Sequence, residues 1–428
     1  MGFVRNVGRV FSPLDEELEL TSERLTPHAH ACLVRYGAII PSFEKARKEV
    51  AFALKIEVSE ATTRRYTQTA GKAYVDGQTA EVERLERETP PAPDGPEKLF
   101  FSADGAMIPL VGGEWAEVKT MTIGEITAPV LEKGEWAVHS QQHSYFSRMV
   151  EAASFQRLAL VESHRRGVEN APTVAAVTDG AEWEQGLIDF HCPKAVRVLD
   201  FSHAGEHLGN IGQALWETED EVRQTWLEEQ LHTLKHEGPT PVLADLLALQ
   251  SQYPQNKAVL DNFNYLNKRE GHMHYPDYQA QGLPIGSGAM ESGNKVVVEA
   301  RLKGAGMHWA PQHVDPMLAL RNALCSDRWD EAWFQILTEL RRAERQRKKE
   351  HLERKQFEGQ VAASQIAEET IHVKVEPVPP AQPNLERAEP EESTPPSGKP
   401  HIPAPNHPWR RSPIGKAKFL PSSSFSKN

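Results

Sequence analysis

Apolar residues in the first part of the chain recur at helical spacing. From Ser22 to about Ala80 the pattern predicts short helices. After a break at 55–58, Ser59 is a good N-cap, and the next helix is expected to end at Gly71. We therefore predict an N-terminal helical domain over residues 20–90. One helix face before the break carries Phe43, Ala46, Val50 and Leu54.

Beyond a proline-rich linker at 88–97, the apolar pattern changes to the alternation typical of strands. We expect three antiparallel strands, then a helix over Tyr145–Arg166, then two buried strands that end at Asp179 and at Asp200 with His203. This order predicts a mixed α/β layer fold, with the acids at the carboxyl ends of strands. The predicted strands are 98–110, 114–126, 136–143, 173–179 and 195–203.

The second half of the chain is predominantly helical. Residues 205–282 have breaks at Gly238-Pro239 and Tyr253-Pro254 and are predicted to form an all-helical insertion between two parts of the core, 96–204 and 283–335. A charged helix follows over 336–372, whose basic run is expected to be a solvated face, with phosphate binding as the alternative. Residues up to about Glu19 are expected to form a loose leader, and the Pro-rich tail at 373–428 is predicted to be disordered.

Composition narrows the class of protein. The chain has 428 residues, a net charge of -12 and a pI of about 5.9, which argues against coating nucleic acid through bulk charge but allows local basic patches. Its three cysteines match no metal or disulfide spacing. No apolar run is long enough to span a membrane. We expect a cytoplasmic, reduced protein with no membrane partner.

Two short helices around the break at 55–58 are compatible with a helix-turn-helix. In that motif the second helix enters the major groove of DNA, and polar side chains reach phosphates and base edges. An ordinary helical hairpin with an exposed basic face is the alternative. The candidate DNA-binding residues are Thr62, Thr63, Arg64, Arg65 and Gln68.

Three acids could form a metal site. Asp104 and Asp179 are each followed by glycine, which lets a nucleic-acid backbone approach closely, although Asp-Gly is also a common turn. Glu291 lies in the first turn of a helix predicted to begin at Ser287, with Lys295 one turn later. Carboxylates suit Mg²⁺ beside a phosphate, and paired ions activate the attacking oxygen and stabilise the leaving one. The alternative for Glu291 is a solvated side chain on a capped helix.

Several motifs together resemble the DDE transposases of bacterial insertion sequences, of the ISKra-type group. The resemblance spans roughly Leu25 to Trp333. It implies an RNase H-like catalytic core interrupted by a helical insertion, a metal-binding triad of Asp104, Asp179 and Glu291, and Mg²⁺ as cofactor, with Mn²⁺ as a substitute. The motifs are Asp104-Gly-Ala, Gly112-Gly-Glu-Trp-Ala-Glu-Val-Lys, Thr178-Asp-Gly-Ala-Glu-Trp, Leu199-Asp-Phe-Ser-His-Ala-Gly-Glu-His-Leu and Pro284-Ile-Gly-Ser-Gly-Ala-Met-Glu-Ser.

The resemblance also implies supporting residues. Asp200 and His203 resemble an Asp-x-x-His element that supports the site or handles the DNA strand, with Lys295 beside Glu291; a structural pair of His203 and His207 is the alternative. Arg301, Lys303 and His308 are candidate phosphate contacts, against a solvated face. Trp115 and Trp183 are expected in the core, with base stacking as the alternative.

The function that this resemblance implies is cleavage at the terminal inverted repeats of an element and joining of the ends to target DNA. The partners would be double-stranded DNA and at least one further copy of the chain, in a bacterial cytoplasm at the nucleoid. Two alternatives stay open: a nuclease or resolvase without strand transfer, and a DNA-binding protein that keeps the fold without catalysis.

Overall fold

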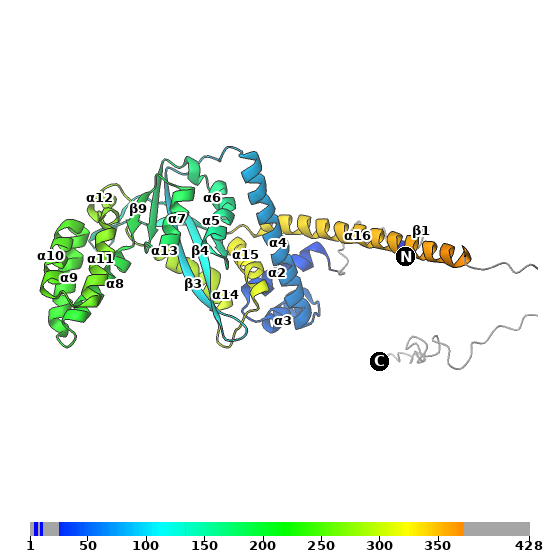
Figure 1. The fold of residues 1–428 in the computed structure, drawn as a ribbon, viewed down its shortest axis with the longest axis horizontal. Helices are drawn as coiled ribbons and strands as arrows, with labels where there is room; N and C mark the ends of the chain where they lie inside the picture. The colour runs from blue at the N-terminus through cyan, green and yellow to red at the C-terminus, as the bar shows by residue number, and fades with distance from the viewer. Residues whose placement is uncertain (1–3, 7–8, 12–24, 133, 372–428) are drawn as a thin grey trace, which may run out of the picture. The chain divides into compact units, whose positions relative to one another are not determined.

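A five-stranded sheet lies at the centre of the fold (Figure 1). The computed structural model describes residues 4–6, 9–11, 25–132 and 134–371. The strand order is β7-β4-β3-β8-β9, in which β3, β4 and β7 are antiparallel and β3, β8 and β9 are parallel. The predicted mixed α/β fold is confirmed. The strands are β3 (Lys98–Pro109), β4 (Trp115–Ile126), β7 (Ser140–Arg148), β8 (Thr173–Thr178) and β9 (Val196–Leu199).

Two antiparallel hairpins lie outside this sheet. The first pairs β1 (Val4–Asn6) with β2 (Arg9–Phe11). The second pairs β5 (Val130–Glu132) with β6 (Glu135–Ala137), so the strand predicted over 136–143 is in fact divided between β6 and β7.

Successive side chains of β3 point to opposite faces of the sheet, as the two-residue period of a strand requires. Phe101 and its alternate neighbours pack into a core with three helices on one face. Phe100 and Ile108 belong to separate clusters on the other face. Asp104 shares this second face and lies between those two clusters along the strand. The helices of the first face are α5 (Ala152–Leu158), α6 (Leu160–Arg165) and α7 (Glu182–His191), with the 3-10 turn η1 (Val168–Asn170) after α6.

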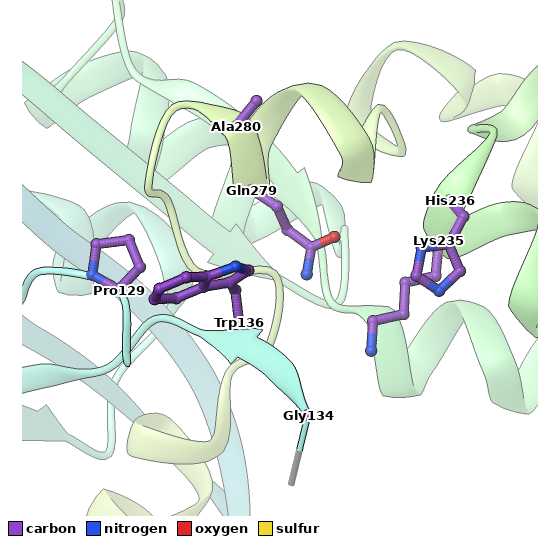
Figure 2. Close-up of a pocket in the computed structure, with 7 residues that line it drawn as sticks. All are labelled: Pro129, Gly134, Trp136, Lys235, His236, Gln279 and Ala280. Atoms are coloured by element: carbon purple, nitrogen blue, oxygen red, sulfur yellow. The ribbon is translucent and has the colours of Figure 1, made fainter. Parts of the chain in front are cut away.

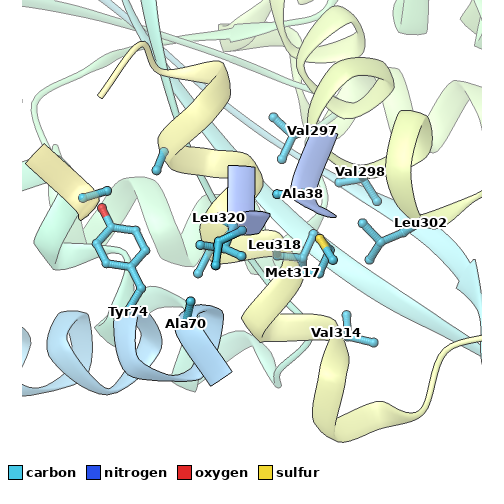
Figure 3. Close-up of a cluster of buried hydrophobic side chains, with 14 of the residues drawn as sticks. Ala38, Ala70, Tyr74, Val297, Val298, Leu302, Val314, Met317, Leu318 and Leu320 are labelled. Carbon is cyan, nitrogen blue, oxygen red and sulfur yellow. The ribbon is translucent and has the colours of Figure 1, made fainter. Parts of the chain in front are cut away.

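The largest apolar cluster joins the N-terminal helices to the helices that follow the insertion (Figure 3). Ala38, Tyr74, Val298 and Leu318 contribute to it from four different helices. The N-terminal helices thus share a core with the sheet. They are α2 (Pro27–Ile39), α3 (Phe43–Leu54) and α4 (Glu60–Glu88); α15 (Val314–Cys325) packs on α4 and β7 and is preceded by the 3-10 turn η4 (Pro311–His313).

Helix α4 continues well beyond Gly71, so the predicted helix end at that residue is wrong. A Cβ atom added at Gly71 would lie 2.2 Å from the carbonyl oxygen of Pro316. The glycine is therefore explained by the close approach of α4 to α15, and not by a helix terminus.

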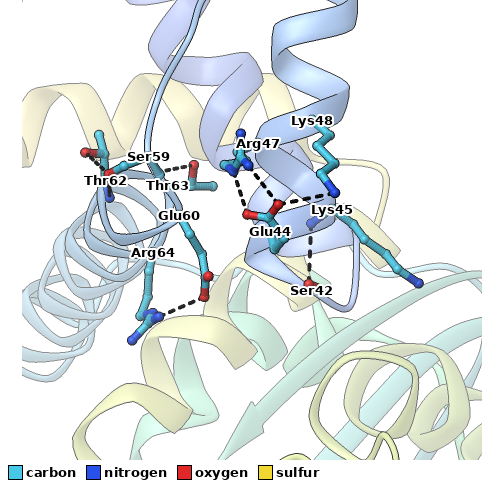
Figure 4. Close-up of polar contacts among 10 residues, drawn as sticks. All are labelled: Ser42, Glu44, Lys45, Arg47, Lys48, Ser59, Glu60, Thr62, Thr63 and Arg64. Carbon is cyan, nitrogen blue, oxygen red and sulfur yellow. Dashed lines mark hydrogen bonds and ion pairs between the residues drawn. The ribbon is translucent and has the colours of Figure 1, made fainter.

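Ser59 begins α4 as the sequence predicts, since its hydroxyl accepts a hydrogen bond of 3.0 Å from the backbone N–H of Thr62 (Figure 4). Ser59→Ala should lower the free energy of unfolding by about 1 kcal/mol, because one N–H at the helix start loses its partner. Urea denaturation measures this change. Ser42→Ala removes a longer N-cap bond of 3.4 Å on α3, so it should lower the free energy of unfolding by less than Ser59→Ala does. Equal stability of Ser59→Ala and the wild type would contradict the capping role.

The predicted all-helical insertion is present and follows β9 directly. Its helices break where expected: Gly238 has a φ of +93°, Pro239 starts the next helix, and that helix ends just before Tyr253. The insertion comprises α8 (Phe201–Leu215), α9 (Asp220–His236), α10 (Pro239–Gln252), α11 (Lys257–Lys268), the 3-10 turn η2 (Glu270–His272) and α12 (Tyr275–Ala280).

A helix after residue 287 is also confirmed, but its middle turn is a π-helix. It comprises α13 (Gly288–Asn294), the π-helical η3 (Lys295–Glu299) and α14 (Ala300–Leu302). The buried Arg321 donates hydrogen bonds to the carbonyl oxygens of Val296 and Val297 inside this turn. Those carbonyls therefore have partners despite the altered helical pattern.

Two further predictions are wrong. Residues 145–148 belong to β7 and pair with β4, so the helix expected over Tyr145–Arg166 begins only at α5. The strand expected over Ala195–His203 ends at Leu199, and His203 lies in α8.

The last described helix is α16 (Trp329–Ile371), whose first turns pack against the core through Trp329 and Ile336. Residues 341–350, the basic run, are almost all exposed, as expected of a solvated face. The contacts divide the chain into a unit that ends at Gln356 and a second that begins at Phe357. The predicted tail at 373–428, and the leader apart from β1 and β2, lie outside the described residues.

Among the helices in the described ranges, none combines the length and apolar character that crossing a membrane requires.

Candidate functional site

Asp104 and Asp179 come together because their strands are parallel neighbours. The register of β3 and β8 pairs Lys98 with Thr173 and Phe101 with Ala176. Continuing this register beyond the last pair places Asp104 level with Asp179, just after β8 ends. The side chain of Asp179 accepts a hydrogen bond of 2.8 Å from the N–H of Ala181, which fixes the turn into α7.

Glu184, which the sequence analysis did not single out, is the third acid at this point. Oxygen atoms of Asp104, Asp179 and Glu184 lie within 4.8 Å of one another. Glu184 is 1% exposed and stands in the first turn of α7, where it accepts hydrogen bonds from the N–H groups of Gly180 and Ala181 at 3.2 and 3.3 Å. Its only sequence signal was its position five residues after Asp179, on the first turn of the following helix.

Burial and mutual repulsion disturb the protonation of these acids. Burial, a hydrogen bond to Asp179 and the charges of Asp179 and Asp104 raise the pKa of Glu184 to about 10. Burial also raises the pKa of Asp104, opposed by the N–H of Gly105. At neutral pH Glu184 is therefore protonated, and a cation that neutralised the cluster would displace its proton.

Asn294 connects the helix of Glu291 to this cluster. Its Nδ2 donates a hydrogen bond of 2.9 Å to Oδ2 of Asp104. The Asn294 side chain is 7% exposed, and its Oδ1 is buried without a hydrogen-bond partner. A buried carbonyl oxygen with no donor, beside a carboxylate, is an additional oxygen of the kind that binds Mg²⁺.

Glu291 itself does not join the cluster of three acids. It precedes Asn294 by one turn of α13, and its side chain is 59% exposed. Its Oε2 lies 3.8 Å from Nζ of Lys295, the residue predicted to accompany it. The structure thus brings together Asp104 and Asp179 from the predicted triad, and places Glu291 on the helix that contacts Asp104 through Asn294.

Asp200 holds the Glu291 helix against the sheet. Its Oδ1 caps α8 by accepting from the N–H of His203 at 2.9 Å, and its Oδ2 accepts from the N–H of Ser287. Ser287 is at the predicted N-cap position, but its side chain makes no capping bond. Asp200, 5% exposed, is therefore a positioning residue that ties the start of the insertion to the start of α13.

His203 and His207 contact each other, with 3.3 Å between their Nε2 atoms. His207 stacks on the ring of Tyr265 at a centroid distance of 3.8 Å, and burial lowers the pKa of His207. The hydroxyl of Tyr265 donates to the backbone carbonyl of Asp179, and Arg269 donates to the carbonyl of Gly180 at 2.7 Å. The insertion therefore holds the loop that carries Asp179.

The candidate DNA-binding residues of α4 differ in exposure. Arg64 and Arg65 are exposed. Arg64 forms an ion pair with Glu60 at 2.8 Å (Figure 4). Arg65 lies over the ring of Tyr66. Thr62 and Gln68 are half-buried. Thr63 is 0% exposed, and its hydroxyl donates to the carbonyl of Ser59, so it has no surface to offer DNA.

Arg301, expected to contact phosphate, is buried in the core. It is 2% exposed, donates to the carbonyl of Gly37 at 3.1 and 3.2 Å, and lies over the rings of Phe43 and Trp309. Burial lowers its pKa to about 10. Lys303 is exposed and paired with Glu299 at 2.9 Å, and His308 is exposed as well.

The two tryptophans expected in the core differ. Trp183 is half-buried on α7, where it packs edge-on against Phe155 with Lys119 over its ring. Trp115 is 56% exposed at the start of β4, so its predicted burial is wrong.

The site therefore has an all-oxygen donor set, which suits Mg²⁺ or Mn²⁺. Two carboxylic acids are held in a setting that disfavours their ionised forms, and the adjacent Asn294 oxygen has no donor. A divalent cation would stabilise the ionised carboxylates and give the Asn294 oxygen a partner, so the residues fit such an ion. No model of a known protein family matches this chain, and no curated protein matches it either.

Proposed function

We propose that this protein is a metal-dependent DNA transposase, which cuts DNA at the terminal inverted repeats of an element and joins the freed ends to target DNA. The observation that carries the proposal is the meeting of Asp104, Asp179 and Glu184 at one edge of the sheet, with the Glu291 helix joined to Asp104 through Asn294. Asp104, Asp179 and the helix of Glu291 come from three separate motifs of the resemblance.

The strand order supports an RNase H-like core. An antiparallel unit of three strands is followed by two parallel strands, and the first strand is central. The helical insertion comes between the last strand and the Glu291 helix, as the resemblance implies. The exposed arginines of α4 are suited to phosphates, although Thr63 and Arg301 are excluded from such a role by burial.

Asp104, Asp179 and Glu184 would hold Mg²⁺, and Glu291 would complete the site when DNA is present. The ion would supply charge stabilisation at the scissile phosphate and make the attacking oxygen more acidic. Asp200 fixes the approach of α13, and Tyr265 and Arg269 fix the Asp179 loop. Pre-positioned groups lower the barrier because little reorganisation is left for the reaction itself.

Neither step consumes a cofactor, because each forms one P–O bond and breaks another. In cleavage, the oxygen of water forms a bond to phosphorus, the bond to the 3′ oxygen breaks, and that oxygen takes a proton. In joining, the resulting 3′-hydroxyl attacks a phosphodiester of the target; one P–O bond forms, one breaks, and the proton passes to the leaving oxygen. Because two ends must be joined to one target, we propose that at least a dimer acts on DNA.

The test is an assay of the full chain on a labelled duplex that carries the inverted repeat flanking its coding sequence, with supercoiled plasmid as target. We expect cleavage at the repeat end and joined products with Mg²⁺, and neither with EDTA. Glu291→Gln should bind the duplex and not cleave it, whereas Glu299→Gln, an acid on the next turns of the same helix, should cleave normally.

Three outcomes contradict the proposal in different ways. Cleavage without joined products would make the protein a nuclease or resolvase. Duplex binding with no cleavage in Mg²⁺ or Mn²⁺ would make it a non-catalytic DNA-binding protein. Full activity of Glu291→Gln would remove that residue from the site and leave Glu184 as the third acid.

A further inference from the structure

A groove runs from the helical insertion to the Glu291 helix. It begins as a cavity of about 630 Å³ between the β5–β6 hairpin, the end of α9 and α12 (Figure 2). Trp136 lies against Pro129 on one side of this cavity, with Gln279 beside it and Lys235 and His236 across from it. The Trp136 side chain is 63% exposed, although tryptophan is usually largely buried.

The cavity continues toward helix α13, which carries Glu291. A second cavity of about 590 Å³ shares Trp136 and Lys235 with the first and reaches the loop at Pro284–Gly288. A third, of about 330 Å³, shares that loop with the second and ends at Ser292. The three therefore form one groove, whose far end is the residue directly after Glu291.

Helical spacing relates the groove to the site. Gly288 and Ser292 are four residues apart and line the groove from one face of α13. Glu291 and Lys295, also four residues apart, lie on the neighbouring face of the helix. Asn294 lies one face further round and donates a hydrogen bond to Asp104. A chain lying in the groove would thus pass one row of α13 away from Glu291.

The lining suits an unpaired nucleotide strand. An exposed indole offers a face on which any base can stack, and nearby cationic groups attract phosphates. Lys235 lines the first two cavities, and His236 lines the first beside it. A Cβ added at Gly286 or Gly288 would meet no atom within 4 Å, so the groove is open to a backbone there.

We propose that this groove binds a single-stranded stretch of DNA next to the cleaved position, with one base stacked on Trp136. The inference rests on the proposed function and adds to it a substrate feature: the protein binds DNA ends with unpaired nucleotides more tightly than blunt ends. A paired base has its faces covered by its neighbours in the duplex, so only an unpaired base can stack on the indole.

The experiment compares two labelled duplexes with the same repeat sequence, one blunt and one with an overhang of about six nucleotides, a length within the site sizes of single-strand binders. Fluorescence anisotropy gives the affinity of the full chain in Ca²⁺, which prevents turnover. A 2-aminopurine in the overhang reports stacking through quenching of its fluorescence. Trp136→Ala is the test variant, Trp136→Phe keeps an aromatic ring, and Trp115→Ala removes another exposed tryptophan, which lines none of the three cavities.

We expect Trp136→Ala to weaken binding of the overhang duplex at least about fivefold, the lower end for loss of one stacked base, and to abolish the quenching. Binding of the blunt duplex should not change. Trp136→Phe should keep most of both signals, and Trp115→Ala should equal the wild type. Circular dichroism of each variant verifies folding.

Equal affinity of the wild type and Trp136→Ala for the overhang duplex would overturn the inference, as would an equal loss with Trp115→Ala. Either result can occur while the wild type still cleaves and joins DNA, in which case the groove proposal alone fails. Failure of the wild type to bind either duplex would overturn both the groove proposal and the proposed function.

Discussion

Replacing Asp179 with asparagine should slow Mg²⁺-dependent DNA cleavage by more than about a hundredfold, beyond the 10–100-fold typical of residues that only support a metal ligand. Asparagine is neutral and binds a hard cation far less well than a carboxylate does. Its side-chain oxygen can still accept the hydrogen bond from the N–H of Ala181, so the turn into α7 is kept. The effect is therefore on the chemistry, with the fold and DNA binding unchanged.

Single-turnover cleavage of the labelled repeat duplex measures the rate, and anisotropy measures binding. Asp261→Asn is the matched control, because Asp261 is exposed on α11 and carries the same change of charge. It should cleave at the wild-type rate. Cleavage by Asp179→Asn within about tenfold of the wild type would place Asp179 among the supporting residues and remove it from the metal ligands.

Glu184→Gln should stabilise the metal-free protein, increasingly so as pH rises. The pKa of Glu184 is about 10 in the folded protein and about 4.5 in the unfolded chain. Between these values the folded protein holds a proton that the unfolded chain has released. Rising pH therefore favours unfolding, by about 1.4 kcal/mol per pH unit for one such group. Glutamine carries no such proton but can still accept the hydrogen bonds of Gly180 and Ala181.

Urea denaturation in EDTA at pH 6 and pH 8 measures this effect. The wild type should lose on the order of 2.7 kcal/mol more than Glu184→Gln over these two pH units, because all other groups titrate alike in both proteins. Glu182 is exposed in the same helical turn, so Glu182→Gln should show the same pH dependence of stability as the wild type. Parallel pH dependence of the wild type and Glu184→Gln would mean that Glu184 is ionised in the folded protein.

The central strands could be predicted because their signal is local. Lys98–Pro109 and Trp115–Ile126 are long, apolar and separated by glycines, and Thr173–Thr178 is a short apolar run that ends at Asp179. The insertion was equally predictable, since glycine and proline interrupt its helices in the sequence itself.

The errors arose where distant contacts override local pattern. Residues 145–148 have apolar spacing compatible with a helix, but they pair with residues 119–122 of β4, a partner that no local window contains. Glycine often marks the end of a helix, but Gly71 lies inside α4 and lets it approach the backbone of Pro316, which is far away in the sequence. Exposure of Trp115 likewise depends on the position of the hairpin in the fold.

The candidate site was predictable in part for the same reason. Asp104 and Asp179 follow or lie in strands, and parallel pairing brings them together. Glu184 and Asn294 carry no motif that distinguishes them from ordinary helical residues, and their roles emerge only when α7 and α13 are placed beside the sheet. Arg301 shows the converse: a basic residue in a basic stretch that the fold uses to bind a backbone carbonyl.

The contacts between the insertion and the 179–180 loop limit which chimaeric proteins can keep this site. Tyr265 and Arg269 belong to the insertion, yet they support the backbone of Asp179 and Gly180. Gly180 has a φ of +84°, and a Cβ atom added there would lie 2.4 Å from Nε of Arg269. Replacing the helical insertion with an unrelated one would therefore remove contacts that hold the backbone of Asp179 and Gly180. A chimaera that takes residues 205–282 from a different protein would have to bring equivalents of both side chains, or take the 179–180 loop along with its own insertion.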